Sequence, residues 1–396
     1  MSLPIVFILL TIVIDAMGIG LIMPVMPDLI QEVMGGSLAQ AAIWGGILSA
    51  GFAVMQFLFS PMLGGLSDRF GRRPVLLVSL AIMAADYAVM AVAGSIWLLL
   101  AGRLVGGVTA ATHAAASAAM ADLSEDDKKA QGFGLISAAF GIGFVLGPLL
   151  GGVLGEWGTR APFWAAAVLA AANAGLGYVV LKETVTDEIR RPLDWSRMNP
   201  FGAFAAVSEL PGIARGLSAY FLYQVSYAVY PAVWAYFGHA RFNWDVGTIG
   251  ISLGLFGVSM AVVQAGLIRV LILRLGEQGT ALFGLGFSAI AYGLIAIVTN
   301  GTLALILTPV AALGAAFAPA LQGMLSRQIG PARQGEIQGV LSSAAAMATI
   351  ISPLLMTQVF AGFTAPDAAI YFPGAPFLLS LVLVTLAYVV MPGRKQ

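Results

Sequence analysis

The chain alternates between long apolar stretches and short polar connections along its whole length. A helix needs about 20 predominantly apolar residues to cross the ~30 Å hydrocarbon core of a bilayer. In the first half, stretches of this length lie near residues 5–26, 41–64, 74–94, 96–120, 131–155 and 161–181. Six more lie near residues 210–237, 246–271, 279–299, 301–325, 335–360 and 370–391. The pattern therefore predicts an all-α, polytopic membrane protein with twelve transmembrane helices.

The composition supports this prediction. Of the 396 residues, 59% are hydrophobic and only 10% are charged, which is far from the balance of a soluble globular protein. The chain has no cysteine, so it contains neither a disulfide framework nor a thiolate metal site. The first apolar stretch has no basic leader and no small-residue cleavage site, and Asp15 interrupts it. We therefore expect that stretch to remain in the protein as a helix.

One long connection carries many of the charges. Residues 182–209 include Lys182, Glu183, Asp187, Glu188, Arg190, Arg191, Asp194 and Arg197. This composition predicts a cytoplasmic linker between an N-terminal six-helix bundle, residues 1–181, and a C-terminal one, residues 210–396. Most Lys and Arg residues lie in the connections after even-numbered helices, so the positive-inside rule places both termini in the cytoplasm.

The two halves resemble one another. The pattern that runs from Gly134 to Pro148 recurs from Gly339 to Pro353, and two leucines follow each proline. The interval between the copies is 205 residues. The sequence Ala-Pro-Phe at 161–163 also recurs at 375–377. The repeats favour a duplicated chain with two pseudo-symmetric halves, an architecture in which one half rocks against the other around a site at mid-membrane.

Two aspartates, Asp15 and Asp86, lie deep within apolar spans. A charged side chain at the centre of a membrane helix costs roughly 2.5–3.5 kcal/mol on insertion scales, so such residues usually mark an ion or substrate pathway. Arg103 and His113 are the candidate partners. The two carboxylates and one guanidinium leave one uncompensated negative charge, which either a proton or a cationic substrate could neutralise. Mutual exclusion of these two ligands would produce antiport.

In this hypothesis each group has its own role. Asp15 is the main coupling carboxylate and Asp86 is the second candidate. Arg103 positions or stabilises a carboxylate, and His113 relays protons or binds substrate through hydrogen bonds. Two structural alternatives stay open, because Arg103 could reach toward the membrane interface and His113 could join two helices by a hydrogen bond.

The connection after the second predicted helix carries four charges in a very short loop. The charged residues of this connection and two of its glycines are Gly64, Asp68, Arg69, Gly71, Arg72 and Arg73. On charge alone, the arginines could simply fix the topology. The whole run, however, resembles the cytoplasmic signature of the major facilitator superfamily, with Ser67 where that signature has alanine. The resemblance implies the fold of that superfamily and a latch between its halves, formed by Asp68, Arg72 and Asp122.

Glycines repeat at four-residue spacing in the fifth predicted helix. The run comprises Gly143, Gly147, Pro148, Gly151 and Gly152. Glycines at this spacing allow two helices to approach closely, so packing alone could explain them. The Gly-Pro-x-x-Gly-Gly ending resembles the motif of the antiporter branch of the superfamily, which implies exchange and not symport.

The N-terminal half resembles bacterial tetracycline/proton antiporters most closely. The similarity lies in residues 15–24, 67–77, 86–87 and 102–104, and it continues more weakly through 241–244, 264–265, 276–277 and 319–323. The resemblance implies efflux of a magnesium-bound tetracycline in exchange for protons. It also implies that Asp15, Gln56, Asp86, Arg103 and Gln264 line the pathway. Ser288 and Met260 depart from the family, which has an acid and a histidine at these positions.

The seventh predicted helix contains tyrosines at helical spacing. Tyr223, Tyr227 and Tyr230 share one face, which could line a pocket for a flat polycyclic drug. A stripe of tyrosines can equally anchor a helix at the membrane interface.

The sequence contains no phosphate-binding glycine loop, metal-ligand cluster or hydrolytic triad, so we expect a transporter and not an enzyme. The leading hypothesis is a proton-coupled multidrug or tetracycline efflux antiporter in a bacterial inner membrane. We expect it to work as a single twelve-helix unit that contacts lipid, without a cofactor, a metal site or a nucleic-acid partner. The alternatives are a proton-coupled carrier of a nutrient or metabolite and a sensor that binds a ligand without moving it.

Overall fold

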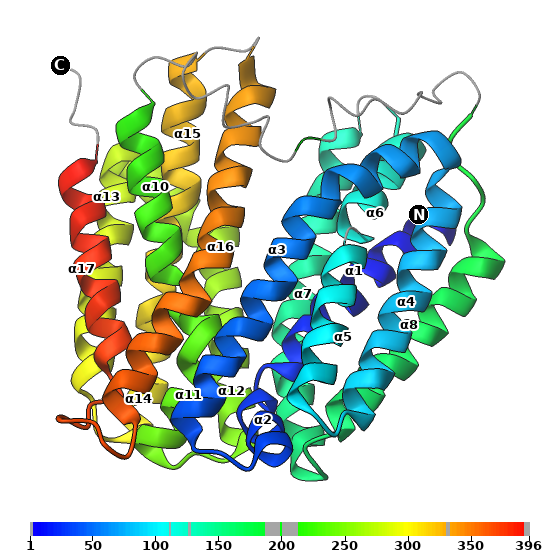
Figure 1. The fold of residues 1–396 in the computed structure, drawn as a ribbon. Coiled ribbons are helices and arrows are strands. Elements are labelled where there is room, and N and C mark those ends of the chain that lie inside the picture. The colour runs from blue at the N-terminus through cyan, green and yellow to red at the C-terminus, as the bar shows by residue number, and fades with distance from the viewer. Residues whose placement is uncertain are drawn as a thin grey trace. The chain divides into compact units, whose positions relative to one another are not determined.

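The computed structural model describes residues 3–110, 112–125, 128–186, 199, 213–329 and 333–391, and all regular structure in these ranges is helical (Figure 1). In the first part of the chain the helices are α1 (Leu3–Ile22), α2 (Met26–Met34), α3 (Leu38–Phe70), α4 (Arg72–Val92), α5 (Ile96–Thr109), α6 (Thr112–Leu123), α7 (Lys129–Glu156) and α8 (Ala161–Val180). After residue 213 they are α10 (Ala214–Tyr227), α11 (Val229–Phe242), α12 (Val246–Val262), η2 (Val263–Leu267), α13 (Ile268–Ile297), α14 (Gly301–Ala312), η3 (Leu313–Ala316), α15 (Phe317–Ile329), α16 (Gln334–Thr364) and α17 (Ala375–Val390).

The helices agree with the predicted twelve spans. Within the described ranges, nine helical stretches are long and apolar enough to cross a membrane. One of them, Val246–Ile297, breaks at Gly276, where φ is 69° and ψ is 176°, and therefore supplies two spans. We assign the remaining two spans to α10 with α11 and to the short apolar helix α17.

Several predicted span boundaries were wrong. Helix α1 ends at Ile22 and not near 26, because the chain turns at residues 23–25, around Pro24. Helix α3 continues to Phe70 and not 64, and the seventh span continues to Phe242 and not 237. The predicted linker at 182–209 lies mostly outside the described residues, so the division of the chain at that linker stays a prediction.

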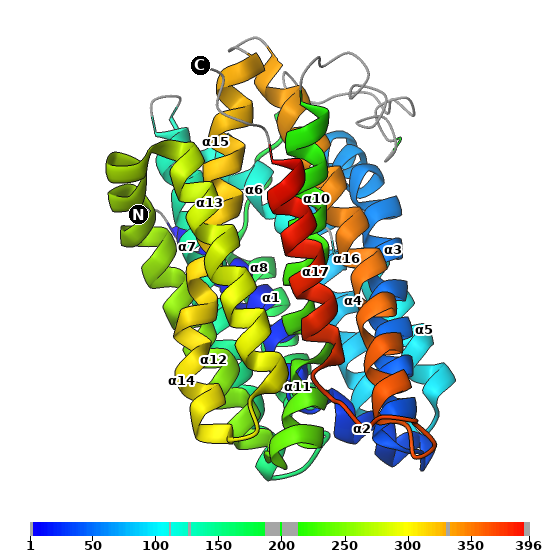
Figure 2. The same cartoon turned by 90° about the vertical axis from the view of Figure 1, so that its left-hand side faces the viewer.

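The helices form two compact units. The first unit comprises Met1–Gly35, Gly51–Pro200 and Val246–Gly254, and the second comprises Gly36–Ala50, Phe201–Asp245 and Leu255–Gln396. In the first unit α4 lies beside α8 and α1 beside α7 (Figure 1). In the second unit α10 packs against α16 and α17, and α13 packs against α15 and α17 (Figure 2).

Glycines bring α7 into backbone contact with α1. A Cβ atom added at Gly147 would lie 2.6 Å from the carbonyl oxygen of Met17 and 2.8 Å from Cα of Gly20. Gly143 and Gly151 face the backbone of α1 in the same way. Inside a bilayer, helices associate mainly through such van der Waals packing, because lipid is as apolar as the helix surfaces. The packing interpretation of this motif is therefore confirmed for these three glycines.

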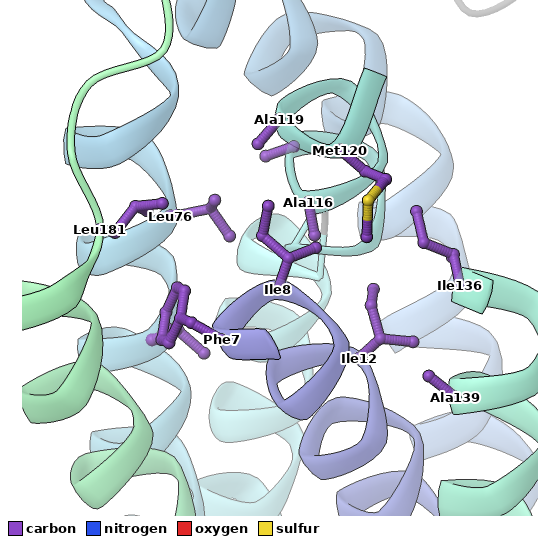
Figure 3. Packing of buried hydrophobic residues seen from close by; sticks show 12 residues of the cluster. Phe7, Ile8, Ile12, Leu76, Ala116, Ala119, Met120, Ile136, Ala139 and Leu181 are labelled. Carbon is purple, nitrogen blue, oxygen red and sulfur yellow. The ribbon is translucent and has the colours of Figure 1, made fainter. Parts of the chain in front are cut away.

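A buried apolar cluster fills one end of the first unit, where α1 meets α4, α6 and α7 (Figure 3). Phe7, Ile8 and Ile12 of α1 provide its centre and are at most 1% exposed. Leu76 of α4 and Met120 of α6 close it from two sides. This cluster fixes the start of α1, and hence the position of Asp15 two turns later.

Two arginines outside the predicted cytoplasmic connections have a structural role. Arg160 donates from Nη1 to the carbonyl oxygen of Ala91 at the end of α4, at 2.8 Å, and pairs with Glu32 at 3.0 Å. In the second unit, Arg241 donates to the carbonyl oxygens of Ile297 and Val298 at the end of α13. Both guanidinium groups satisfy free carbonyls at the negative end of a helix, a position that favours a cation.

The backbone confirms the duplication. Corresponding elements start 205 residues apart, at Ile96 and Gly301, Thr112 and Phe317, and Lys129 and Gln334. The residues before the first pair, Ser95 and Asn300, both accept a hydrogen bond from the amide three residues on. The repeat also includes packing, because Gly250 of α12 approaches the carbonyl of Pro148 in the first unit and Gly46 of α3 approaches that of Pro353 in the second.

Gly147→Ala should destabilise the protein, because the added methyl group would overlap the backbone of α1. Overpacking of this kind typically costs about 1–3 kcal/mol. Gly141→Ala on the same helix is the matched control, because a Cβ at Gly141 has no neighbour within 4 Å. The control should keep or raise the melting temperature, since alanine favours a helix over glycine by about 1 kcal/mol. Thermal unfolding in detergent checks both variants, and equal melting temperatures would contradict the prediction.

Candidate functional site

The carboxylate of Asp86 lies in a niche between α4 and α5. Asp86 is 6% exposed. A Cβ atom added at Gly102 would lie 2.7 Å from Oδ1, and one added at Gly106 would lie 2.5 Å from Oδ2. The two glycines therefore leave the space that the carboxylate occupies. Among the described residues, Oδ1 has no hydrogen-bond partner. A buried oxygen of this kind is costly unless a ligand or proton satisfies it.

Arg103 follows Gly102 on α5 and carries the positive charge of this region. Its guanidinium lies 4.2 Å from the ring centroid of Phe52 on α3, a cation–π contact. It also interacts electrostatically with Asp86 and Tyr87. No ion pair within 4.0 Å joins Arg103 to either aspartate in the described part of the chain, so the predicted partnership is electrostatic and not a direct salt bridge.

Tyr87 follows Asp86 on α4 and reaches α1, the helix that carries Asp15. Its ring packs against Gly18 of α1, where an added Cβ would lie 3.1 Å from Cζ and overlap the hydroxyl group. The side chain interacts electrostatically with Asp15, Asp86 and Arg103. Asp15 is partly buried on α1, one turn before Gly18. The first unit therefore gathers both predicted carboxylates and Arg103 around one tyrosine.

Sequence reasoning did not assign a role to Tyr87. The available signal was Gly18, which lies three residues after Asp15 and leaves room beside it for a large side chain. Gln56 is half-buried on α3, one turn after Phe52, so it shares the face that meets Arg103. The side chain of His113 lies outside the described residues, and its predicted role stays a prediction.

The second unit contains an aromatic cluster. Tyr223 and Tyr230 are 2% and 6% exposed, so the alternative that they anchor the helix at the membrane interface was wrong. Tyr227 lies between them, with ring centroids 5.9 Å from Tyr223 and 6.0 Å from Tyr230. Its hydroxyl group donates to Sδ of Met260 at 3.1 Å. Met260, where the resemblance implies a histidine, therefore faces the tyrosines.

Aromatic side chains from other helices extend this cluster. Tyr230 packs against Phe256 of α12, Tyr292 of α13 and Phe377 of α17. Ser288, where the family has an acid, is 4% exposed and faces Gly314 of η3. The second unit therefore presents rings and neutral polar groups where the first presents charges.

Gln264 lies in the π-helix η2, and its side chain is exposed. Short π-helical segments often mark functional sites. The described contacts do not join Gln264 to the aromatic cluster, so its predicted place in the pathway stays a prediction.

The sequence from Gly64 to Arg73 forms an ionic network at the end of α3 and the start of α4. Arg72 pairs with Asp68 and with Asp122 of α6, the latter at 3.2 Å. Its Nη1 also donates to Oγ of Ser67 at 3.2 Å. The serine that departs from the family signature therefore takes part in the network. The side chains of Arg72 and Asp122 are 13% and 17% exposed, although Asp122 as a whole residue lies at the surface.

The prediction that this sequence forms a loop was wrong. Residues up to Phe70 continue α3, and α4 begins at Arg72. Gly71 alone reverses the chain, with φ 112° and ψ 153°, a conformation that favours glycine. Gly64 has open space beside it and Arg69 is exposed, so neither belongs to the network formed by the described residues.

Glu183 completes the network and was not predicted. Helix α4 has no capping side chain at Gly71, which leaves its first amides without partners. The Glu183 carboxylate accepts from the amides of Arg72 at 2.8 Å and Arg73 at 3.3 Å. It occupies the space that a Cβ at Gly71 would need. The next residue, Thr184, donates to Asp122 at 3.1 Å, so the start of the predicted linker is tied to the signature sequence.

Arg73 points the other way from Arg72. Its Nη2 donates to the carbonyl oxygen of Tyr178 near the end of α8, at 2.9 Å, and its guanidinium lies 5.4 Å from the ring centroid of Tyr178.

The described residues contain no group of three or more His, Cys, Asp or Glu side chains that could hold a metal ion.

Comparison with known proteins places this arrangement in a family. The model of the Major Facilitator Superfamily matches residues 8–211. The tetracycline resistance protein of class C from Escherichia coli is 41% identical over 90% of this chain and 89% of its own length. The class G protein from Vibrio anguillarum is 40% identical over 89% of each chain. The crystal structure of the human organic anion transporter MFSD10 has a TM-score of 0.69 and 26% identity, and the match covers 98% of both chains. This multi-pass membrane protein therefore belongs to the major facilitator superfamily.

Proposed function

We propose that this protein is an antiporter that exports a magnesium-bound tetracycline, or a similar amphipathic polycyclic drug, in exchange for protons by alternating access. The observation that carries the proposal is the similarity to tetracycline resistance proteins over nine-tenths of the chain. The charges of the first unit and the aromatic cluster of the second support it.

The first unit supplies a site for exchange. Asp15, Asp86 and Arg103 together carry one net negative charge when all three are ionised. An unpartnered carboxylate oxygen in an apolar niche costs free energy, which a bound proton or a cationic drug complex offsets. The two ligands therefore compete, and competition on alternate sides of the membrane produces obligatory exchange.

The second unit supplies a surface for the rings of a drug. Tyr223, Tyr227 and Tyr230 form a continuous aromatic face, and the partly exposed Tyr227 is the member placed to meet a ligand. Stacking on such a face, with few polar contacts, suits a flat polycyclic molecule.

A carrier of a metabolite is the second candidate. The similarity to a human organic anion transporter favours it, but the net negative charge of the first unit disfavours an anion. A sensor that does not transport has less support, because the ionic network around Arg72 matches the transport signature in full apart from Ser67.

We further propose that the protein lies in a bacterial inner membrane as a single twelve-helix unit, with both termini in the cytoplasm. Asp68, Arg72 and Asp122 then form a latch on the cytoplasmic side. The family consists of transporters, and we propose no catalytic activity or resident cofactor.

Asp86→Asn should abolish proton-coupled transport, because asparagine fills the same niche without a titratable charge. We expect the rate of proton movement on adding tetracycline with magnesium to fall at least about tenfold in proteoliposomes, and the same loss in Asp15→Asn. Asp367→Asn, at an exposed position between α16 and α17, is the control and should behave as wild type. Normal proton coupling in Asp15→Asn would remove that residue from its assigned role.

Tyr227→Ala should weaken drug binding, because it removes the central ring of the aromatic face. Aromatic pairs contribute about 0.5–1.5 kcal/mol, so the KM for tetracycline should rise roughly 2- to 10-fold. Tyr227→Phe should stay near wild type if the ring matters more than its bond to Met260. Tyr388→Ala on α17, 54% exposed, is the control. An unchanged KM and substrate preference in Tyr227→Ala would exclude the residue from the site.

The proposed orientation can be tested at the two ends of α7, because the chain has no cysteine of its own. Single cysteines at Glu125→Cys and Glu156→Cys flank this helix at exposed positions. In intact cells, a membrane-impermeant maleimide should label only Glu156→Cys, and both should react after permeabilisation. The opposite pattern would mean that the termini lie outside the cytoplasm.

A further inference from the structure

The duplication places a second ionic contact at the positions of the second repeat that correspond to the first contact. Gly71 and Gly276 are 205 residues apart, and both have positive φ, at 112° and 69°. Gly71 reverses the chain between α3 and α4, and Gly276 breaks α13. Each glycine therefore begins a transmembrane helix in its own unit, and the residue after it occupies the same position in both repeats.

The side chains after these glycines form corresponding ion pairs with exchanged charges. In the first unit Arg72 binds Asp122 at 3.2 Å. In the second unit Glu277 binds Arg327 at 2.6 Å. Each residue of the second pair follows its counterpart by 205 positions. In both units the contact joins the third helix of the repeat to the fourth. The charges are exchanged, because the acid Glu277 stands where the first unit has Arg72, and the base Arg327 stands where it has Asp122.

This exchange indicates that the contact itself is required. Changing the sign at one position alone would place two like charges together, so a stable exchange needs both substitutions. If neither unit needed the contact, nothing would link the two changes. Gly323 of α15 also accommodates the pair, because a Cβ there would lie 2.7 Å from Oε1 of Glu277.

The two contacts differ in their surroundings. Arg72 is held by two carboxylates, Asp68 and Asp122. The position equivalent to Asp68 in the second unit is Leu273, which is 78% exposed. In the described part of the second unit, Arg327 is the one ion-pair partner of Glu277. The first pair therefore has a fixed polarity, whereas the ion pairs described for the second unit place no further charge on the second pair that would fix which member is the acid.

We propose that Glu277 and Arg327 form a latch within the second unit that transport requires, and that the polarity of this latch is interchangeable. The proposal rests on the proposed transport function. The pair holds the start of the second part of α13 against α15. Glu277 and Arg327 are positioning residues, since the described contacts place neither of them in the aromatic cluster or beside the buried aspartates.

A charge-swap cycle tests the latch. Glu277→Arg and Arg327→Glu should each lower the maximal rate of tetracycline/proton exchange in proteoliposomes at least tenfold, with little change in KM. The variant carrying both substitutions should recover to within about twofold of wild type. Melting temperatures should change little, because Arg327 is 74% exposed and exposed ion pairs contribute little to stability.

Two control variants accompany this charge-swap cycle. Glu336→Arg breaks the other ion pair at this end of the second unit, with Arg333, and should leave the rate unchanged. Arg72→Asp combined with Asp122→Arg should not recover activity, because the new acid would face Asp68. Recovery in this first-unit swap would show that the two latches do not differ as argued.

Full transport in the single variants, or a double variant no better than they are, would overturn the latch. If the wild type fails to move tetracycline, the proposed function fails, and amide hydrogen exchange still tests the latch. The single variants should then exchange faster than wild type over residues 277–283, and the double variant should exchange at the wild-type rate.

Discussion

Charge in an apolar environment is the constraint around which this protein is built. Within the spans, glycines make room for the carboxylate of Asp86, and a ring covers the guanidinium of Arg103. At the ends of the helices, arginines bind free carbonyls or carboxylates. Oδ1 of Asp86, however, is a buried carboxylate oxygen without a hydrogen-bond partner among the described residues. In a membrane an unsatisfied charged atom of this kind costs free energy that a bound proton or ligand offsets.

The two units contain different kinds of functional side chain. The first contains the titratable groups, gathered around Tyr87, and the second contains stacked rings and neutral hydroxyl groups. Ser288 and Met260, where the resemblance implied an acid and a histidine, fit this division, because neither adds a titratable charge to the second unit.

The sequence was sufficient for the fold, and it pointed to the three charged residues of the candidate site. Apolar length predicted the twelve spans, and buried charge predicted Asp15, Asp86 and Arg103. The sequence could not reveal contacts between distant segments, such as the bond of Glu183 to Arg72, 111 residues away. The helix breaks at Ala228 and in η3 were also missed, although Pro231 and Pro319 follow them by three residues and each proline removes the hydrogen bond to the carbonyl four residues before it. A search for identical residues in the two halves does not find the Glu277–Arg327 pair, because its charges are exchanged relative to those of Arg72 and Asp122.

The two copies of the repeat also differ in length at one connection. The interval is 205 residues up to the start of α16, but the Ala-Pro-Phe copies that begin α8 and α17 are 214 residues apart. The chain from the start of α16 through its connection to α17 is therefore nine residues longer than the equivalent stretch from α7 to α8. That connection is fastened by Tyr371, which donates to the carbonyl oxygen of Ala240. The helices before this turn keep the 205-residue register although the turn itself differs in length, so the length of the turn does not set their register.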